Sequence, residues 1–183
     1  LVKERPGLIP DTQWKYEKKK QQWYLGETFN SAIGQGYVSV TPMQMAQLMS
    51  AVANGGSIYK PTIVKLETML PPLKNADIKP EILELVKKGL FGVVNEGGGT
   101  GGAARSPIVT VGGKTGTAQV VGIRKSSNLL PERFRDHAWF VAFAPVEKPE
   151  IALCAFVEHG GHGGGAAAPI AKRAIEAYFK NKE

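Results

Sequence analysis

The sequence has 183 residues and a formal net charge of +7, with 43% hydrophobic and 21% charged residues. This size fits one domain or part of one, and the composition is that of an ordinary folded domain, which excludes a disordered or collagen-like chain. No apolar run approaches the roughly 18 residues of a membrane-spanning helix, and a single cysteine excludes an internal disulfide framework.

Residues 1–36 are rich in proline, glycine and charge, and predict a loop-rich opening segment with a short helix near residues 11–21. Lysines and aromatic residues gather in this segment. Lysines can contact phosphates and aromatic rings can stack on bases. The cluster is short and contains no arginine, so we interpret it as a solvated loop face and predict no nucleic-acid partner. Its members are Trp14, Lys15, Tyr16, Lys18, Lys19, Lys20, Trp23 and Tyr24.

A helix is predicted to begin at Pro42, because Thr41 and Gln44 form a capping box with proline at the first helical position. It should end at residues 54–56, Asn-Gly-Gly. Its methionines are spaced as core residues, not as metal ligands. Residues 63–66 predict a short strand, and a second helix should begin at Pro80 and end near Asn95.

The glycine-rich run at residues 97–102 lacks the Gly-Lys-Ser/Thr ending of a phosphate-binding loop, and predicts a mobile connector instead. Three strand-like segments follow, at residues 108–122, 137–146 and 150–158, and the turn at 147–149 joins the last two as a hairpin.

The last two strands are almost continuously apolar, which indicates that helices cover both faces of their sheet. The final helix is predicted over residues 169–180, after a sharp turn at residues 160–165. The fold class is therefore α+β, with an antiparallel sheet covered by helices on both faces. Cys154 is interpreted as a small buried hydrophobe. His159 and His162, with His137, are candidate zinc ligands, but the first pair lies in a glycine run with no carboxylate or cysteine positioned beside it, so no metal or cofactor is predicted.

Residues 114–117, Lys-Thr-Gly-Thr, begin a strand-like stretch and are the candidate functional residues. Lys114 supplies a cation, Thr115 and Thr117 supply hydroxyls, and Gly116 lets a ligand approach the backbone. This set suits an extended acyl substrate that carries a carboxylate. Alternation places Lys114 on the opposite strand face from both threonines, so a pocket along the exposed edge of the strand is needed to receive all three.

Lys-Thr-Gly, together with S-x-x-K and S-D-N, is the signature set of penicillin-binding proteins and class A β-lactamases. Residues 26–56 and 137–145 also resemble the stretches that flank this strand in class B penicillin-binding proteins. Residues 6–10, Pro-Gly-Leu-Ile-Pro, with Trp14 and the later Gly-Glu-Thr, are most similar to the elongation-type subgroup, penicillin-binding protein 2. The resemblance implies that residues 1–183 form the C-terminal portion of one transpeptidase domain with the serine β-lactamase-like fold.

By this resemblance, Lys114 assists proton transfer at the catalytic serine, Thr115 and Thr117 bind the carboxylate of a D-Ala-D-Ala stem peptide or a β-lactam, and the Thr117 N–H is an oxyanion donor. The family further implies a membrane anchor, a polymerase partner of the elongation machinery, and a location at the periplasmic face of the bacterial inner membrane.

No nucleophile is predicted in this chain. Ser57 and Lys60 match S-x-x-K literally, but they follow a Gly-Gly stop, whereas a helix is needed to place both on one face. Residues 126–128, Ser-Ser-Asn, match S-x-N but come after Lys114 rather than before it. Both motifs are expected upstream of Leu1. Two alternatives stay open: a non-catalytic peptidoglycan-binding or sensor module, and a related D,D-carboxypeptidase or β-lactamase.

Overall fold

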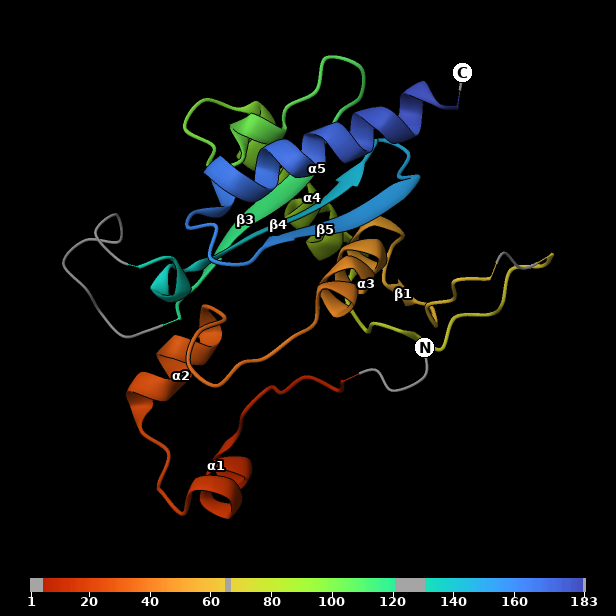
Figure 1. Ribbon diagram of the computed structural model, residues 1–183. Helices are drawn as coiled ribbons and strands as arrows, with labels where there is room; N and C mark the ends of the chain where they lie inside the picture. Colours follow the sequence, from red (N-terminus) through yellow and green to blue (C-terminus); the bar gives the residue numbers. More distant parts are fainter. Residues whose placement is uncertain (1–4, 65–66, 121–130, 183) are drawn as a thin grey trace. The chain divides into compact units, whose positions relative to one another are not determined.

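The computed structural model describes residues 5–64, 67–120 and 131–182. They group into two compact units, a smaller one up to Thr41 and a larger one from Pro42 onward. In the described ranges, no helix combines the length and the apolar character needed to cross a membrane. The helices and strands are labelled in Figure 1.

The smaller unit contains two helices, α1 (Thr12–Lys19) and α2 (Leu25–Ala32). The first lies in the predicted range and is capped by Asp11, whose carboxylate accepts a hydrogen bond of 2.7 Å from the backbone of Trp14. The second helix was not predicted, so the interpretation of residues 1–36 as mostly loop was wrong for this stretch. Its start depends on Glu27, whose side chain accepts the backbone N–H of Tyr24 at 2.8 Å.

Lys15 is a buried charged residue of the smaller unit, with 2% of its surface exposed. Its ammonium lies 2.5 Å from the Glu27 carboxylate and 4.7 Å from the centre of the Tyr24 ring. The predicted solvated face is therefore wrong for Lys15, although Lys18 and Lys20 are exposed as expected. A lysine can be buried here because a carboxylate and an aromatic face replace its water.

The larger unit contains three α-helices, a two-stranded sheet and a three-stranded sheet among its described residues. The helices are α3 (Pro42–Ala53), α4 (Pro80–Asn95) and α5 (Gly163–Lys180), with short 3-10 turns η1 (Gly102–Ala104) and η2 (Glu132–Phe134). The strands are β1 (Ser57–Ile58), β2 (Lys74–Asn75), β3 (Gly112–Ala118), β4 (His137–Ala144) and β5 (Ile151–Val157).

The main sheet has the order β3-β4-β5, and both pairs of neighbouring strands are antiparallel. Helix α5 packs on one face of it, and α3 packs on the other (Figure 1). The predicted hairpin and the predicted covering of both faces are thus confirmed. In the described part of the chain β3 pairs with β4 alone, so no strand occupies its other edge, which is called the open edge below.

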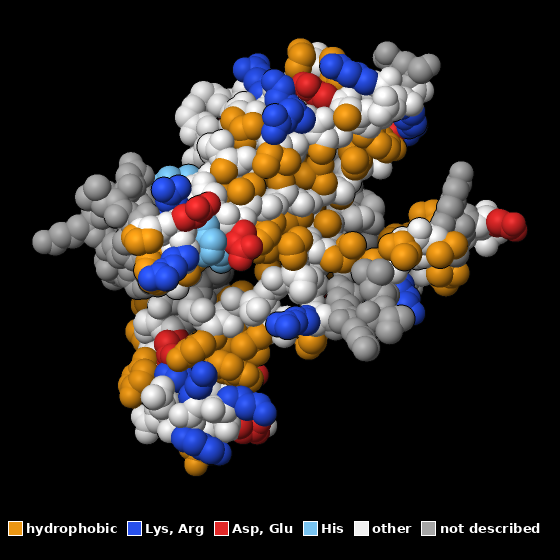
Figure 2. Space-filling view, viewed as in Figure 1, with side chains coloured by type: hydrophobic (Ala, Val, Ile, Leu, Met, Phe, Trp, Pro, Cys, Tyr) orange, Lys and Arg blue, Asp and Glu red, His pale blue; other side chains and the backbone are white. Residues whose placement is uncertain are grey.

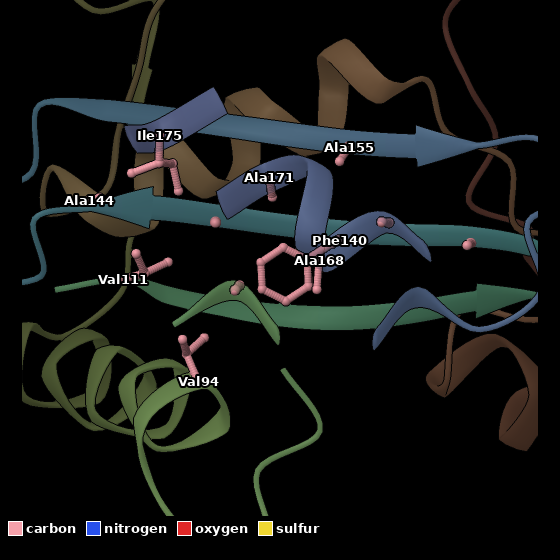
Figure 3. Close-up of a cluster of buried hydrophobic side chains, with 12 residues drawn as sticks. Val94, Val111, Phe140, Ala144, Ala155, Ala168, Ala171 and Ile175 are labelled. Carbon is pink, nitrogen blue, oxygen red and sulfur yellow. The ribbon is translucent and has the colours of Figure 1, made fainter. Parts of the chain in front are cut away.

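Alternate residues of β4 build the two halves of the core. Phe140 is fully buried on the α5 side, where it packs with Ala168 and Ala171 (Figure 3). Phe143, also fully buried, packs with Met49 of α3 on the opposite face. Cys154 packs against this second cluster, but it is only partly buried, whereas the prediction was a buried small hydrophobe.

Elements of the larger unit also differ from the predictions. Of the strand predicted at residues 63–66, residues 65 and 66 lie outside the described residues. Residues 63 and 64 form a bend, whereas the strands of this region are the two-residue β1 and β2 on either side of it. The segment between them carries exposed apolar side chains, which gather on the projection at the right of Figure 2. Helix α5 begins at Gly163, six residues before the predicted start at Pro169, so the glycines at 163–165 are helical and not part of a turn.

Candidate functional site

The predicted site residues lie on β3, at the open edge of the main sheet. Lys114 is opposite Val141 in the register and Thr115 is opposite Phe140. Since Val141 and Phe140 belong to the two different halves of the core, Lys114 and Thr115 point to opposite faces of the sheet, as alternation predicts.

The Lys114 side chain nevertheless reaches Thr115. Its ammonium donates to the Thr115 carbonyl at 3.1 Å and to the Thr115 hydroxyl at 3.2 Å. The flexible lysine stem makes this possible, because it carries the charge back to the neighbouring residue. A cation and a hydroxyl are thereby brought together on a strand whose outer edge is open.

Thr117 follows Thr115 on the same face of the strand, opposite Ala138 of β4, and is partly buried. A Cβ at Gly116 would lie 3.1 Å from the Cβ of Trp139, so glycine lets β3 approach β4 closely at this pair. Gly116 was predicted to let a ligand approach the backbone. The structure shows that it also has a packing role between β3 and β4.

A pocket of about 640 Å³ opens beside Lys114. Its wall is formed by the second half of α4 and by the glycine-rich loop that follows it. The lining residues are Leu85, Lys88, Gly89, Gly92, Val93, Glu96, Gly97, Gly98, Gly99, Thr100 and Lys114.

The glycine-rich loop at residues 97–102 is held against α4, which corrects the prediction of a mobile connector. The backbone N–H of Gly101 donates to the Val93 carbonyl at 2.9 Å. A Cβ at Gly99 would lie only 2.3 Å from the same carbonyl oxygen. Glycine is thus required here for close packing on the helix end, and not for flexibility.

Thr100, within this loop, was missed by the sequence reasoning. Its hydroxyl lies 3.0 Å from the Thr115 hydroxyl. The two residues are 15 positions apart in the sequence, and neither the spacing nor the residue type indicates that they meet.

The helix α5 begins directly over β3 and β4. A Cβ at Gly163 would lie 2.2 Å from the Trp139 carbonyl oxygen and 2.5 Å from the Gly116 carbonyl oxygen. A Cβ at Gly164 would lie 2.6 Å from the Thr100 carbonyl oxygen. The first turn of α5 therefore fixes the strand and the loop that carry the candidate residues.

The histidines have structural contacts. The backbone N–H of His159 donates to Nδ1 of His137 at 2.9 Å, and Nδ1 of His159 donates to the Arg135 carbonyl at 3.0 Å. His162 is the residue before the first turn of α5. Among the described residues, no three His, Cys, Asp or Glu side chains form a group that could hold a metal.

The structure describes one of the two sequence matches to a nucleophile motif, the S-x-x-K match at Ser57 and Lys60. As predicted, it does not lie on a helix. Ser57 lies in β1 and its hydroxyl donates to Oδ1 of Asn75 at 3.0 Å, so Ser57 and Lys60 are not on a helix. The match at residues 126–128 lies outside the described residues.

Comparison with known proteins identifies the family. Residues 3–176 match the model of the penicillin binding protein transpeptidase domain. The chain belongs to this family. The predictions of the family and of the fold class are confirmed.

Relatives named peptidoglycan D,D-transpeptidase MrdA are similar over most of this chain. The protein of Haemophilus influenzae is 34% identical, over 100% of this chain and 30% of its own length. The protein of Escherichia coli strain K12 is 34% identical, over 89% of this chain and 28% of its own length. The chain thus spans about a third or less of these relatives.

Two solved structures of penicillin-binding protein 2 have a similar fold. The Pseudomonas aeruginosa protein in complex with WCK 5153 has a TM-score of 0.83 at 35% identity, covering 97% of this chain and 39% of that one. The Helicobacter pylori protein in complex with MreC has a TM-score of 0.83 at 31% identity, and the match covers 100% of this chain and 33% of that one. The names of these proteins agree with the subgroup that the sequence predicts.

Proposed function

We propose that the protein containing this chain is a peptidoglycan D,D-transpeptidase of the elongation type. It attacks the D-Ala-D-Ala amide of a stem peptide with a serine, releases D-alanine and transfers the acyl group to an amine on a neighbouring strand. β-Lactams acylate the same serine. The observation that carries this proposal is the open edge of β3, where Lys114 and Thr115 meet within the transpeptidase family's Lys-Thr-Gly motif.

The chemistry requires a nucleophile, a proton carrier, donors for the oxyanion and a site for the substrate carboxylate. In our proposal the Lys114 ammonium is the cation at the proton-transfer site. Thr115 and Thr117, two residues apart on one strand face, bind the carboxylate, and the Thr117 N–H stabilises the oxyanion. A substrate backbone adds as an extra strand along the edge of β3 that faces away from β4.

The serine and its lysine are proposed to lie in sequence upstream of Leu1, since Ser57 occupies a strand and is bonded to Asn75. The likeness to penicillin-binding protein 2 in complex with MreC supports a partner in the elongation machinery. We further propose that a membrane anchor outside residues 1–183 holds the enzyme at the periplasmic face of the inner membrane, as the family resemblance implies.

The test is penicillin acylation of the full-length protein with Lys114→Ala, and with Lys60→Ala as the matched control. Removing Lys114 should slow acylation by at least about 100-fold, because the lost cation no longer stabilises charge that develops in the transition state. Removing Lys60 should leave the rate within about twofold, because Lys60 lines a different pocket from the one beside Lys114. The second-order rate constant is measured for each variant.

Three results contradict the proposal in different ways. A larger loss with Lys60→Ala makes Ser57 the nucleophile and the upstream placement wrong. Absence of any covalent adduct in the parent protein indicates a non-catalytic binding module. Rapid deacylation with hydrolysis of the β-lactam, or D-alanine release without an amine acceptor, indicates a β-lactamase or a carboxypeptidase.

A further inference from the structure

The side chain of Thr100 contacts the candidate carboxylate-binding residue from outside the Lys-Thr-Gly strand. Its hydroxyl is 3.0 Å from that of Thr115, and either oxygen can be the donor. The Lys114 ammonium is 3.2 Å from the same Thr115 oxygen. Thr115 is therefore shared between a cation on one side and a hydroxyl on the other.

The hydrogen-bonding capacity of Thr115 decides what this arrangement does. A threonine hydroxyl has one proton to donate and two positions at which it accepts. An ammonium group can only donate, so Lys114 fills one accepting position. When Thr100 donates as well, both accepting positions are filled and the Thr115 proton is left for a ligand.

A carboxylate selects this direction, because its oxygens can only accept. If Thr115 donated to Thr100 instead, its proton would not be available to the carboxylate. The Thr115 oxygen and a carboxylate oxygen would then face each other with no proton between them, which is repulsive. The Thr100 hydroxyl therefore favours the one orientation of Thr115 in which it can bind an anion.

The loop is built to hold Thr100 at this place. Gly99 and Gly101 flank it and pack on the end of α4, where Val93 accepts the Gly101 N–H. On the other side, Gly164 of α5 leaves room for the Thr100 carbonyl, which a Cβ would approach to 2.6 Å. The backbone at Thr100 is thus held between α4 and α5, while the residue itself stays exposed to solvent. A side chain on a backbone held in this way loses less entropy when a ligand binds.

We propose that Thr100 is a positioning residue that sets the Thr115 hydroxyl to donate to the carboxylate of the substrate. This inference rests on the proposed function, since the carboxylate is that of the stem peptide or the β-lactam. Thr100 does not touch the reacting atoms. It acts through Thr115.

The experiment measures penicillin acylation of the full-length protein with Thr100→Val, Thr100→Ala and Thr100→Ser, alone and combined with Thr115→Val. The first two remove the hydroxyl. Thr62→Val is the matched control, because the Thr62 hydroxyl makes local bonds, donating to the Val64 carbonyl at 3.1 Å and accepting the Val64 N–H at 3.2 Å. Saturation kinetics separate the apparent penicillin affinity from the limiting acylation rate.

Thr100→Val and Thr100→Ala should each lower the second-order rate constant about fivefold, as expected for one lost hydrogen bond, and mainly through affinity. Thr100→Ser should restore the parent rate, and Thr62→Val should not change it. In the Thr115→Val background, loss of the Thr100 hydroxyl should have less than about a twofold effect, because residues that act through one another are not additive.

A full fivefold loss in the Thr115→Val background would show that Thr100 acts by another route, and parent-like rates in Thr100→Val and Thr100→Ala would show that its hydroxyl is dispensable. Either outcome overturns the role of Thr100 and leaves the proposed function standing. If the parent protein forms no penicillin adduct, the proposed function itself fails, and the carboxylate role fails with it.

Discussion

Substituting Gly163 by alanine should be among the most damaging single-methyl changes in the larger unit. The added Cβ would lie 2.2 Å from the Trp139 carbonyl oxygen, 2.5 Å from the Gly116 carbonyl oxygen and 3.0 Å from the Gly116 nitrogen. All three are backbone atoms of a paired sheet, so no side-chain rotation can relieve the contact. The helix must move.

The size of that movement follows from the distances. Carrying the methyl from 2.2 Å out to the 3.4 Å at which ordinary contact begins requires a shift of about 1.2 Å. Helix α5 contributes Ala167, Ala168, Ala171 and Ile175 to the core, each with 0% of its surface exposed, and a shift of this size separates them from the sheet. Overpacking typically costs about 1–3 kcal/mol, and the rigid neighbours place this case at about 3 kcal/mol or more.

Gly165→Ala is the matched control, since it adds the same methyl two residues further along α5. No atom lies within 4 Å of its added Cβ. Alanine is a better helix former than glycine, so this change should stabilise the protein by about 0.5–1 kcal/mol. Equilibrium urea denaturation of the parent and both variants measures the difference. A Gly163→Ala variant within about 0.5 kcal/mol of the parent would refute the argument, as would equal losses in the two variants.

Two further predictions concern ionisable groups. Burial raises the pKa of the Cys154 thiol to about 11 from 9.0, so iodoacetamide should alkylate it at pH 8 about 100-fold more slowly than in the urea-unfolded chain. Equal alkylation rates in the folded and unfolded chains would contradict the burial of Cys154. Because the folded protein retains the thiol proton more tightly than the unfolded chain does, the free energy of unfolding should fall as pH rises above about 9. Lys15→Met should increase the rate of proteolytic cleavage within residues 2–41, whereas Lys18→Met, at an exposed position, should not. Because the hydrogen bond from Lys15 lowers the pKa of Glu27, protection by this pair should be present above the ordinary carboxyl pKa and lost as pH falls below it.

The sequence predicts best those elements whose cause is local. Helices α3 and α4 begin at Pro42 and Pro80, the residues at which proline in the first turn predicts a start. Strands β4 and β5 lie within the predicted apolar runs. In the site, alternation alone places Lys114 and Thr115 on opposite faces of β3, as found.

Other features depend on contacts that no local pattern reveals. Helix α2 is short, and its apolar residues Leu25 and Phe29 are exposed, as is Ile33 directly after its end. The apolar spacing is present in the sequence but is obscured by the surrounding glycine and polar residues. The meeting of Thr100 with Thr115 depends on how a loop folds back on α4. The burial of Lys15 depends on Glu27, which is 12 residues away.

The glycines show why the errors concentrate around the site. A propensity argument treats a run of glycines as a break, because glycine loses the most entropy when it is ordered. At Gly99, Gly163 and Gly164 the absence of a Cβ has the opposite consequence, since it lets a loop and a helix end come within contact distance of backbone carbonyls. Close approach of this kind fixes β3, the Thr100 loop and the start of α5 against one another. In the proposed function β3 binds the substrate along its unpaired edge, so it must be held from its paired side and its faces. The close contacts at these glycines supply that support, as a preorganised site requires.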